Sequence, residues 1–213
     1  MAPETILFGA DYSVYVRIAR MTLIEKGVGY RLVPVDAFSK DGLPDWYREI
    51  HPFGKIPAFE HDGFRLFETA AIARYIDEAF EGPPLQPLRA PERAVMNQII
   101  GMLDAYAYRT LVWDIYVERV ARPRDGETSD EARIAAALPA AQRCLSALAK
   151  AKRPGQWLIG DQLSLADLHA APMLAYFMEA PEGSDMLSEF AKLSAWWAKV
   201  SALESFEATR TAP

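Results

Sequence analysis

The chain has 213 residues, a net charge of −6 at pH 7 and 51% hydrophobic residues. This length is enough for one large domain or two small ones with a sizeable core. The negative charge argues against a general nucleic-acid or membrane binder, although it is compatible with a local basic pocket. We therefore expect a globular protein whose partners include neither nucleic acid nor a membrane.

The chain has one cysteine, Cys144, and three histidines. A single cysteine excludes a disulfide framework and is typical of a reducing compartment, so we expect a cytoplasmic location. A structural zinc site would find few ligands, and no metal is expected. The N-terminal residues show no charged leader followed by an apolar run, and no apolar run approaches the length of about 18 residues that a membrane span needs.

The first 80 residues alternate short apolar runs with helical patterns. Pro34 favours an edge position for the second predicted strand, because proline has no N–H to donate to a neighbour. Asp62-Gly63 between the last two strands is a strong hairpin signal. The predicted strands are 5–8, 30–35, 57–60 and 64–67, and the predicted helices are 14–26, 44–50 and 69–79. This order predicts a small α/β domain over residues 1–80.

The remainder of the chain is predicted to be helical. Residues 81–90 are rich in proline and are interpreted as a linker. Beyond them no strand signal returns, and two long helices are predicted, one from Pro91 to about Val120 and one from Asp130 to Lys150. Ser164 and Asp167 have the spacing of a capping box at the start of a further helix. We therefore expect an all-helical domain over residues 91–213.

The most informative segment reads HPFGKIPAF over residues 51–59 and is followed by Glu68-Thr69. Pro57 cannot be an ordinary member of a central strand, because its φ is fixed and it has no N–H. A cis Ile56–Pro57 bond would leave the N–H and C=O of Ile56 available to an extended peptide. Lys55 and Glu68 would then hold the charged ends of that peptide. The alternative is a surface turn with scattered charges.

Three motifs in this order resemble the cytosolic glutathione transferase superfamily. They are PFGKIP at residues 52–57, LFETAAI at residues 66–72 and SLAD at residues 164–167. The resemblance covers essentially the whole chain and is to serine-type members, either bacterial-like or phi/theta-like. It implies a thioredoxin-like N-terminal domain plus an all-α C-terminal domain. It also implies a homodimer that uses glutathione as co-substrate and has no permanently bound cofactor.

The resemblance extends to individual residues of a glutathione site. Pro57 resembles the family's cis-proline, and Ile56 the residue whose backbone pairs with the cysteinyl part of glutathione. Glu68 and Thr69 resemble the pair that holds the γ-glutamyl end, Glu68 at its ammonium and Thr69, near a helix N-terminus, at its carboxylate. Lys55 resembles the residue placed near the tripeptide backbone or the glycyl carboxylate.

The same resemblance indicates which residue activates the thiol. Aligning Arg20 with the family's helix-1 arginine places Ser13 where the serine-type classes keep their catalytic hydroxyl. Ser13 is also a good helix N-cap, and both roles are compatible. Tyr12 is the second choice, because a slip of one residue would make it the donor to sulfur. Val14 replaces the usual proline after the serine, which leaves the geometry of this turn open.

The function predicted from these residues is that of a glutathione transferase active in detoxification. The enzyme would activate the glutathione thiol for attack on a small apolar electrophile. Tyr15, Tyr106 and Trp113 are candidates for the electrophile pocket, although aromatic residues at such spacing also fit a core or a dimer contact. One alternative is a glutathione-dependent cis–trans isomerase, which the turn sequence DYSVY disfavours. Another is a non-catalytic glutathione-binding or regulatory protein of the same fold.

Overall fold

The computed structural model describes residues 4–40 and 42–210. Their contacts divide the chain into two compact units. One unit contains the described residues up to Pro84 and those from Leu203 onward, and the other is Leu85–Ala202. The last helix, α10 (Glu204–Ala208), packs on the first helix of the chain, where Ser205 donates a hydrogen bond to Glu25. The all-helical unit therefore ends earlier than the domain predicted for residues 91–213.

The first unit has the predicted β-α-β-α-β-β-α order. Its elements are β1 (Thr5–Gly9), α1 (Val14–Glu25), β2 (Arg31–Pro34), α2 (Asp45–Ile50), β3 (Ala58–His61), β4 (Phe64–Phe67) and α3 (Thr69–Ala79). The sheet order is β2-β1-β3-β4, with β1 parallel to β2 and antiparallel to β3. β2 is an edge strand, as Pro34 predicts.

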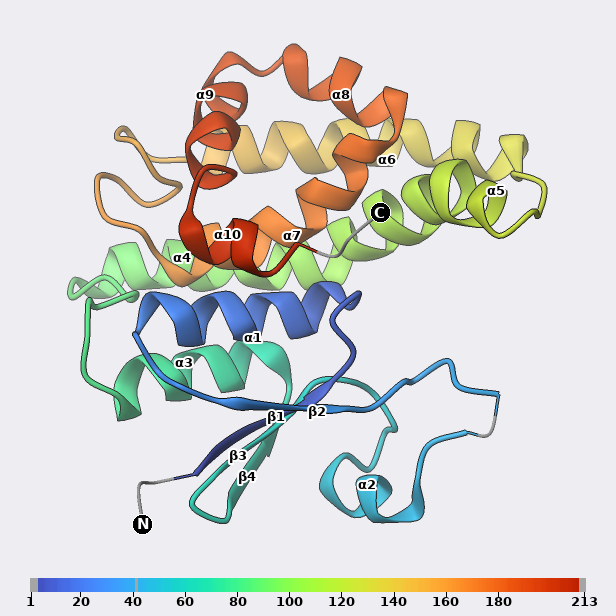
Figure 1. The fold of residues 1–213 in the computed structure, drawn as a ribbon. Coiled ribbons are helices and arrows are strands. Elements are labelled where there is room, and N and C mark those ends of the chain that lie inside the picture. The colour runs from blue at the N-terminus through green and yellow to red at the C-terminus, as the bar shows by residue number, and fades with distance from the viewer. Residues whose placement is uncertain (1–3, 41, 211–213) are drawn as a thin grey trace. The chain divides into compact units, whose positions relative to one another are not determined.

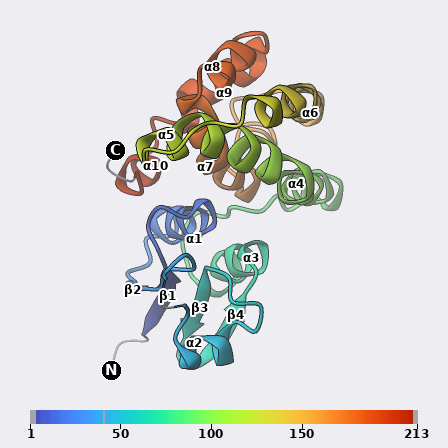
Figure 2. The same cartoon turned by 90° about the vertical axis from the view of Figure 1, so that its right-hand side faces the viewer.

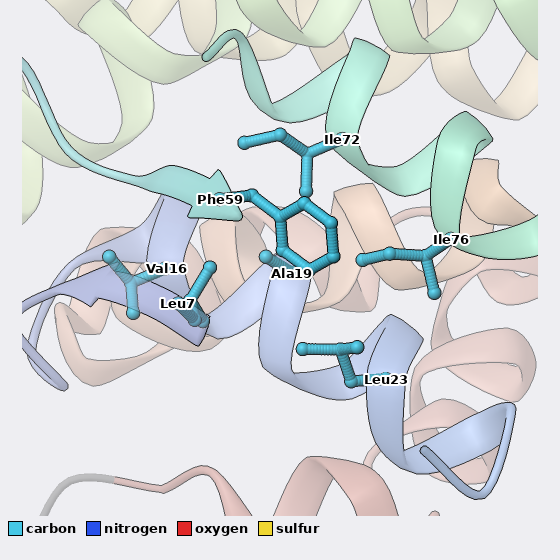
Figure 3. Close-up of a cluster of buried hydrophobic side chains, with 7 residues drawn as sticks. All are labelled: Leu7, Val16, Ala19, Leu23, Phe59, Ile72 and Ile76. Carbon is cyan, nitrogen blue, oxygen red and sulfur yellow. The ribbon is translucent and has the colours of Figure 1, made fainter. Parts of the chain in front are cut away.

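Successive side chains of β1 point to opposite faces of the sheet, and each face carries one hydrophobic cluster. Leu7 lies in a cluster with α1, α3 and β3 (Figure 3). Ile6 and Phe8 point to the opposite face, where they pack with Tyr47 and Ile50 of α2. Figures 1 and 2 show this layering, with α1 and α3 covering one face of the sheet and α2 on the other side.

The second unit is helical, and its elements before α10 are α4 (Ala90–Met102), η1 (Leu103–Ala121), α5 (Arg122–Arg124), α6 (Glu131–Ala151), α7 (Leu165–Glu179), α8 (Pro181–Ser188) and α9 (Ala191–Val200). The helix predicted from Pro91 to Val120 has the expected extent, but η1 is a π-helix, so the α-helical prediction is wrong for this part. Arg122 N–H bonds to the carbonyl of Val117, five residues back. Side chains five residues apart also interact, since Arg109 Nε forms a salt bridge with Asp114 Oδ1 at 3.0 Å. Hydrophobic periodicity did not reveal this wider winding.

The capping box at Ser164 is confirmed. The carboxylate of Asp167 is fully buried and accepts bonds from the N–H and hydroxyl of Ser164, the N–H of Leu158 and the indole of Trp196. Burial raises the pKa of this carboxyl, and the four hydrogen bonds oppose that shift. Asp167 therefore joins α7 to α9 and to the loop before α7. No helix in the described parts of the chain is long and apolar enough to span a membrane.

Candidate functional site

The strand register brings three separate segments to one end of the sheet. Phe8 of β1 pairs with Ala58 of β3, and Ala58 pairs with Phe67 of β4. Both pairings are antiparallel, so β1 and β4 end where β3 begins. The segments after β1 and β4 therefore lie at the same end of the sheet as the segment before β3. The predicted residues in these segments are Ser13, Ile56, Pro57, Glu68 and Thr69.

Gly9 allows these segments to approach closely. A Cβ at Gly9 would lie 2.4 Å from the side chain of Val16 on α1 and 3.4 Å from Cβ of Ile56. A contact of 2.4 Å leaves no room for a side chain, so glycine is required for β1 to pass this close to α1. The loop that carries Ser13 consequently starts close to Ile56.

The segment before β3 has the geometry of a peptide-binding edge. The Ile56–Pro57 bond is cis, as predicted. In the described structure neither the N–H nor the C=O of Ile56 takes part in a backbone hydrogen bond. Lys55 is exposed, and its carbonyl accepts a hydrogen bond from the Tyr47 hydroxyl at 2.7 Å. The backbone of Ile56 can therefore pair with an extended ligand.

Glu68 and Thr69 open α3. Glu68 is the N-cap residue, with φ 71° and ψ 108°. A positive φ of this size is unusual for any residue other than glycine. Its exposed carboxylate makes no hydrogen bond or ion pair to the residues that the structure describes. Thr69 is the first residue of α3, where the leading N–H groups have no intrahelical acceptor. An α-amino carboxylate fits this arrangement, with its carboxylate at the helix N-terminus and its ammonium at Glu68.

Ser13 is the N-cap of α1. Its hydroxyl oxygen accepts a hydrogen bond from the N–H of Val16 at 3.4 Å, and its hydroxyl hydrogen has no acceptor within the described residues. The turn before α1 closes through Ser13 N–H to the carbonyl of Ala10 at 3.1 Å. Val14 is the first residue of α1, so the turn forms without the usual proline. The half-buried hydroxyl thus combines an N-cap with a hydrogen that is available to a ligand.

Tyr12 is engaged elsewhere. Its hydroxyl donates to the carboxylate of Asp36, and its ring stacks on Phe38 with the centroids 6.1 Å apart. Both partners lie in the segment after β2, so Tyr12 joins that segment to the loop after β1. The Tyr12 hydroxyl therefore has an acceptor in the protein, whereas the Ser13 hydroxyl hydrogen has none among the described residues.

His51 lies behind the predicted binding residues. Its side chain is 3% exposed, and its ring packs on Phe67 with the centroids 4.8 Å apart. Burial lowers the pKa of His51; nearby Glu68 opposes this shift, and Lys55 adds to it. The charges of Glu68 and Lys55 thus act in opposite directions on the same buried imidazole.

The three residues predicted for a second-substrate pocket do not lie in one unit. Tyr15 is half-buried on α1, whereas Tyr106 and Trp113 belong to η1 of the helical unit. Tyr106 is 66% exposed, so the alternative that it belongs to the core is wrong. Trp113 is half-buried and hydrogen-bonds Tyr108, five residues away. The π-helical winding of η1 explains the exposure of Tyr106 and the Tyr108–Trp113 hydrogen bond, because it changes which residues share a helix face from the α-helical spacing.

Sequence reasoning missed Tyr47 and Asp36. Tyr47 binds the carbonyl before Ile56, and Asp36 holds the phenol of Tyr12. Tyr47 belongs to a short predicted helix that carried no recognisable chemical motif, and the partners of both residues depend on the register of the sheet. The only available signal was position in the chain: Asp36 follows β2, and Tyr47 lies in α2, which precedes β3.

Two family models match the chain. The model described as "Glutathione S-transferase, N-terminal domain" matches residues 7–84, and the model described as "Glutathione S-transferase, C-terminal domain" matches residues 104–204. Glutathione S-transferase F10 of Arabidopsis thaliana is 31% identical over 86% of this chain and 86% of its own length. Glutathione S-transferase F13 of the same plant is 28% identical over 90% and 88% of the two chains.

Solved structures agree with these sequence matches. Glutathione S-transferase III in its apo form has a TM-score of 0.85 and 27% identity, with 99% of each chain covered. Glutathione transferase F7 from Populus trichocarpa has a TM-score of 0.83 and 28% identity, with 96% of this chain and 97% of the other covered. The α/β unit and the helical unit are thus those of the glutathione transferase fold. The chain belongs to the cytosolic glutathione transferase superfamily and is a glutathione transferase.

Proposed function

We propose that this glutathione transferase uses Ser13 to activate the thiol of glutathione for attack on a small apolar electrophile. The observation that carries this proposal is the Ser13 hydroxyl, which caps α1 at the sheet end that also holds Ile56 and Glu68. A free thiol has a pKa of about 8.5 and is mostly protonated at neutral pH. Lowering that pKa by about two units requires about 2.7 kcal/mol of preferential thiolate stabilisation.

Two features of this chain supply that stabilisation. The Ser13 hydroxyl donates a hydrogen bond to the thiolate, and a bond to a charged acceptor is about twice as strong as one between neutral groups. The N-terminus of α1 adds the positive end of a helix dipole. The thiol proton leaves to solvent. Sulfur then forms a bond to an electrophilic carbon of the second substrate, which either loses its leaving group with the bonding pair or takes up a proton after addition.

The remaining residues hold the tripeptide. The backbone N–H and C=O of Ile56 pair with the cysteinyl residue, and Pro57 sets the edge that makes this pairing accessible. Glu68 binds the ammonium of the γ-glutamyl group, and Thr69 binds its carboxylate at the start of α3. Lys55, which is exposed, lies near the tripeptide backbone or the glycyl carboxylate.

Several broader features belong to the same proposal. The enzyme acts in the cytoplasm as a homodimer in detoxification, and Tyr15 of the first unit contributes to binding of the electrophile. Glutathione is a co-substrate, and no cofactor is permanently bound. Among the subclasses predicted, the relatives named F10 and F13 favour the phi-like one.

Binding and turnover are tested together. We expect the protein to be retained on immobilised glutathione and to conjugate a chloronitrobenzene. Glu68→Ala should lose most of both activities. Glu81→Ala, which removes an exposed carboxylate outside the site of the same unit, should lose neither.

Three other outcomes would change the proposal. Failure of the wild type to bind glutathione at millimolar concentration would refute the site. Binding without turnover of a panel of electrophiles would favour a non-catalytic glutathione-binding protein. Reversible isomerisation of a cis alkene diacid without conjugation would favour the isomerase.

A further inference from the structure

Tyr47 of α2 lies directly behind the segment that carries Ile56. The tyrosine is fully buried, and its hydroxyl donates to the carbonyl of Lys55 at 2.7 Å. Its ring packs against Phe8 and Trp46, with centroids 6.3 Å and 5.7 Å away, so packing fixes the direction of the hydroxyl. Burial raises the pKa of the phenol, which therefore stays protonated and remains a donor at neutral pH.

The hydrogen bond from Tyr47 to the Lys55 carbonyl also affects the N–H of Ile56. The carbonyl of Lys55 and the N–H of Ile56 belong to one planar trans peptide unit, in which they point in opposite directions. A bond that fixes the carbonyl therefore also fixes the direction of the N–H. The same bond polarises the peptide unit and strengthens its N–H as a donor. Because that N–H makes no backbone hydrogen bond to the described residues, it is available to a ligand.

We propose that Tyr47 is a positioning residue for glutathione, whose hydroxyl directs the Ile56 N–H toward the cysteinyl backbone of the tripeptide. Tyr47 acts from the buried side of the peptide unit and does not touch the ligand. The inference rests on the proposed function, because it requires glutathione to pair with Ile56. A competing explanation is that the buried phenol only needs an acceptor, with no effect on the ligand.

Tyr47→Phe separates these explanations, because it removes one oxygen and keeps the ring. We expect the Kd and KM for glutathione to rise about fivefold, the size of one neutral hydrogen bond. The kcat should change by less than about twofold, and the KM for the electrophile should stay unchanged. A role restricted to folding would lower the melting temperature and leave the Kd for glutathione at its wild-type value.

Tyr75→Phe is the matched control. It removes a hydroxyl that lies 2.9 Å from Nδ1 of His61, at the opposite end of β3 from Ile56. This change is chemically identical and occurs in the same unit. We expect Tyr75→Phe to leave glutathione affinity unchanged. An equal loss of affinity in Tyr75→Phe and Tyr47→Phe would overturn the proposal, because both changes would then act through general stability.

The amide of Ile56 provides a second readout by NMR. Saturating glutathione should move the Ile56 amide proton downfield in the wild type and by a smaller amount in Tyr47→Phe. Full wild-type affinity and an equal shift in Tyr47→Phe would overturn the positioning role. Should Tyr47→Phe fail to fold, an Ile56 amide that does not respond to glutathione in the wild type would overturn it. Failure of the wild type to bind glutathione would instead overturn the proposed function.

Discussion

The hydroxyl of Tyr12 donates a hydrogen bond to the carboxylate of Asp36 and thereby ties the loop after β1 to the segment after β2. Ser13, the next residue, keeps its hydroxyl hydrogen available while its oxygen caps α1. These two neighbouring hydroxyl groups thus differ, because that of Tyr12 has an acceptor in the protein and the hydrogen of Ser13 has none among the described residues.

The first prediction tests this division. Ser13→Ala should raise the apparent pKa of bound glutathione thiol toward about 8.5, because the thiolate loses its hydrogen-bond donor. Turnover at neutral pH should fall about 10- to 100-fold. The titration is followed by thiolate absorbance in the binary complex. Tyr12→Phe should leave the thiol pKa unchanged, and the reverse pattern would assign the donor role to Tyr12.

The second prediction concerns the backbone of Glu68. Its φ of 71° lies in the left-handed region that favours glycine. We expect Glu68→Gly to be more stable toward urea than Glu68→Ala by about 1 kcal/mol, because only glycine relieves this conformation. Both variants should lose glutathione affinity, since both lack the carboxylate. Equal stability of the two variants would show that the left-handed backbone imposes no cost.

Much of the fold could be predicted because its signals are local. Asp62-Gly63 marks the β3–β4 hairpin, and both residues adopt positive φ, as a tight hairpin requires. Pro34 placed β2 at the edge of the sheet. The spacing of Ser164 and Asp167 identified the start of α7. Each of these features depends on residues that are near neighbours in the chain.

The features that sequence reasoning missed depend on distant partners or on the winding of a helix. The bond from Tyr47 to the Lys55 carbonyl requires α2 to pack on the sheet, and no motif encodes that contact. The packing of α10 on α1 joins segments about 180 residues apart, as the Ser205–Glu25 hydrogen bond shows. Periodic apolar residues predicted a helix over η1 and gave no indication of its π winding.

The third prediction concerns Asp167, whose two carboxylate oxygens receive four hydrogen bonds. Asp167→Asn replaces one acceptor oxygen with an NH₂ group, which would face a donor in a fully buried position. We expect the free energy of unfolding to fall by about 3 kcal/mol, as measured by urea denaturation. Asp161→Asn, at an exposed carboxylate in the loop before α7, should cost less than about 1 kcal/mol. Equal effects of the two changes would contradict the anchoring role of Asp167.

The fourth prediction concerns the pH dependence that His51 gives to folding. Nδ1 of His51 is buried with no hydrogen-bond partner in the described structure, and burial lowers its pKa from 6.5. Between the lowered pKa and 6.5, the unfolded chain binds a proton at this residue and the folded chain does not. The contribution of His51 to the free energy of unfolding should therefore fall as the pH drops below 6.5 and level off below the folded pKa.

Urea unfolding at a series of pH values between about 5 and 8 measures this contribution as a difference between wild type and His51→Asn. The variant should lose less stability than the wild type as the pH decreases, because it has no imidazole to protonate. The charge of Glu68 favours protonated His51, and the charge of Lys55 disfavours it. Lys55→Met should therefore weaken the pH dependence of the free energy of unfolding, and Glu68→Gln should strengthen it. His61→Asn is the control, since His61 is only half-buried and its Nδ1 is hydrogen-bonded to Tyr75. Parallel curves for the wild type and His51→Asn would show that His51 titrates alike in the folded and unfolded chains.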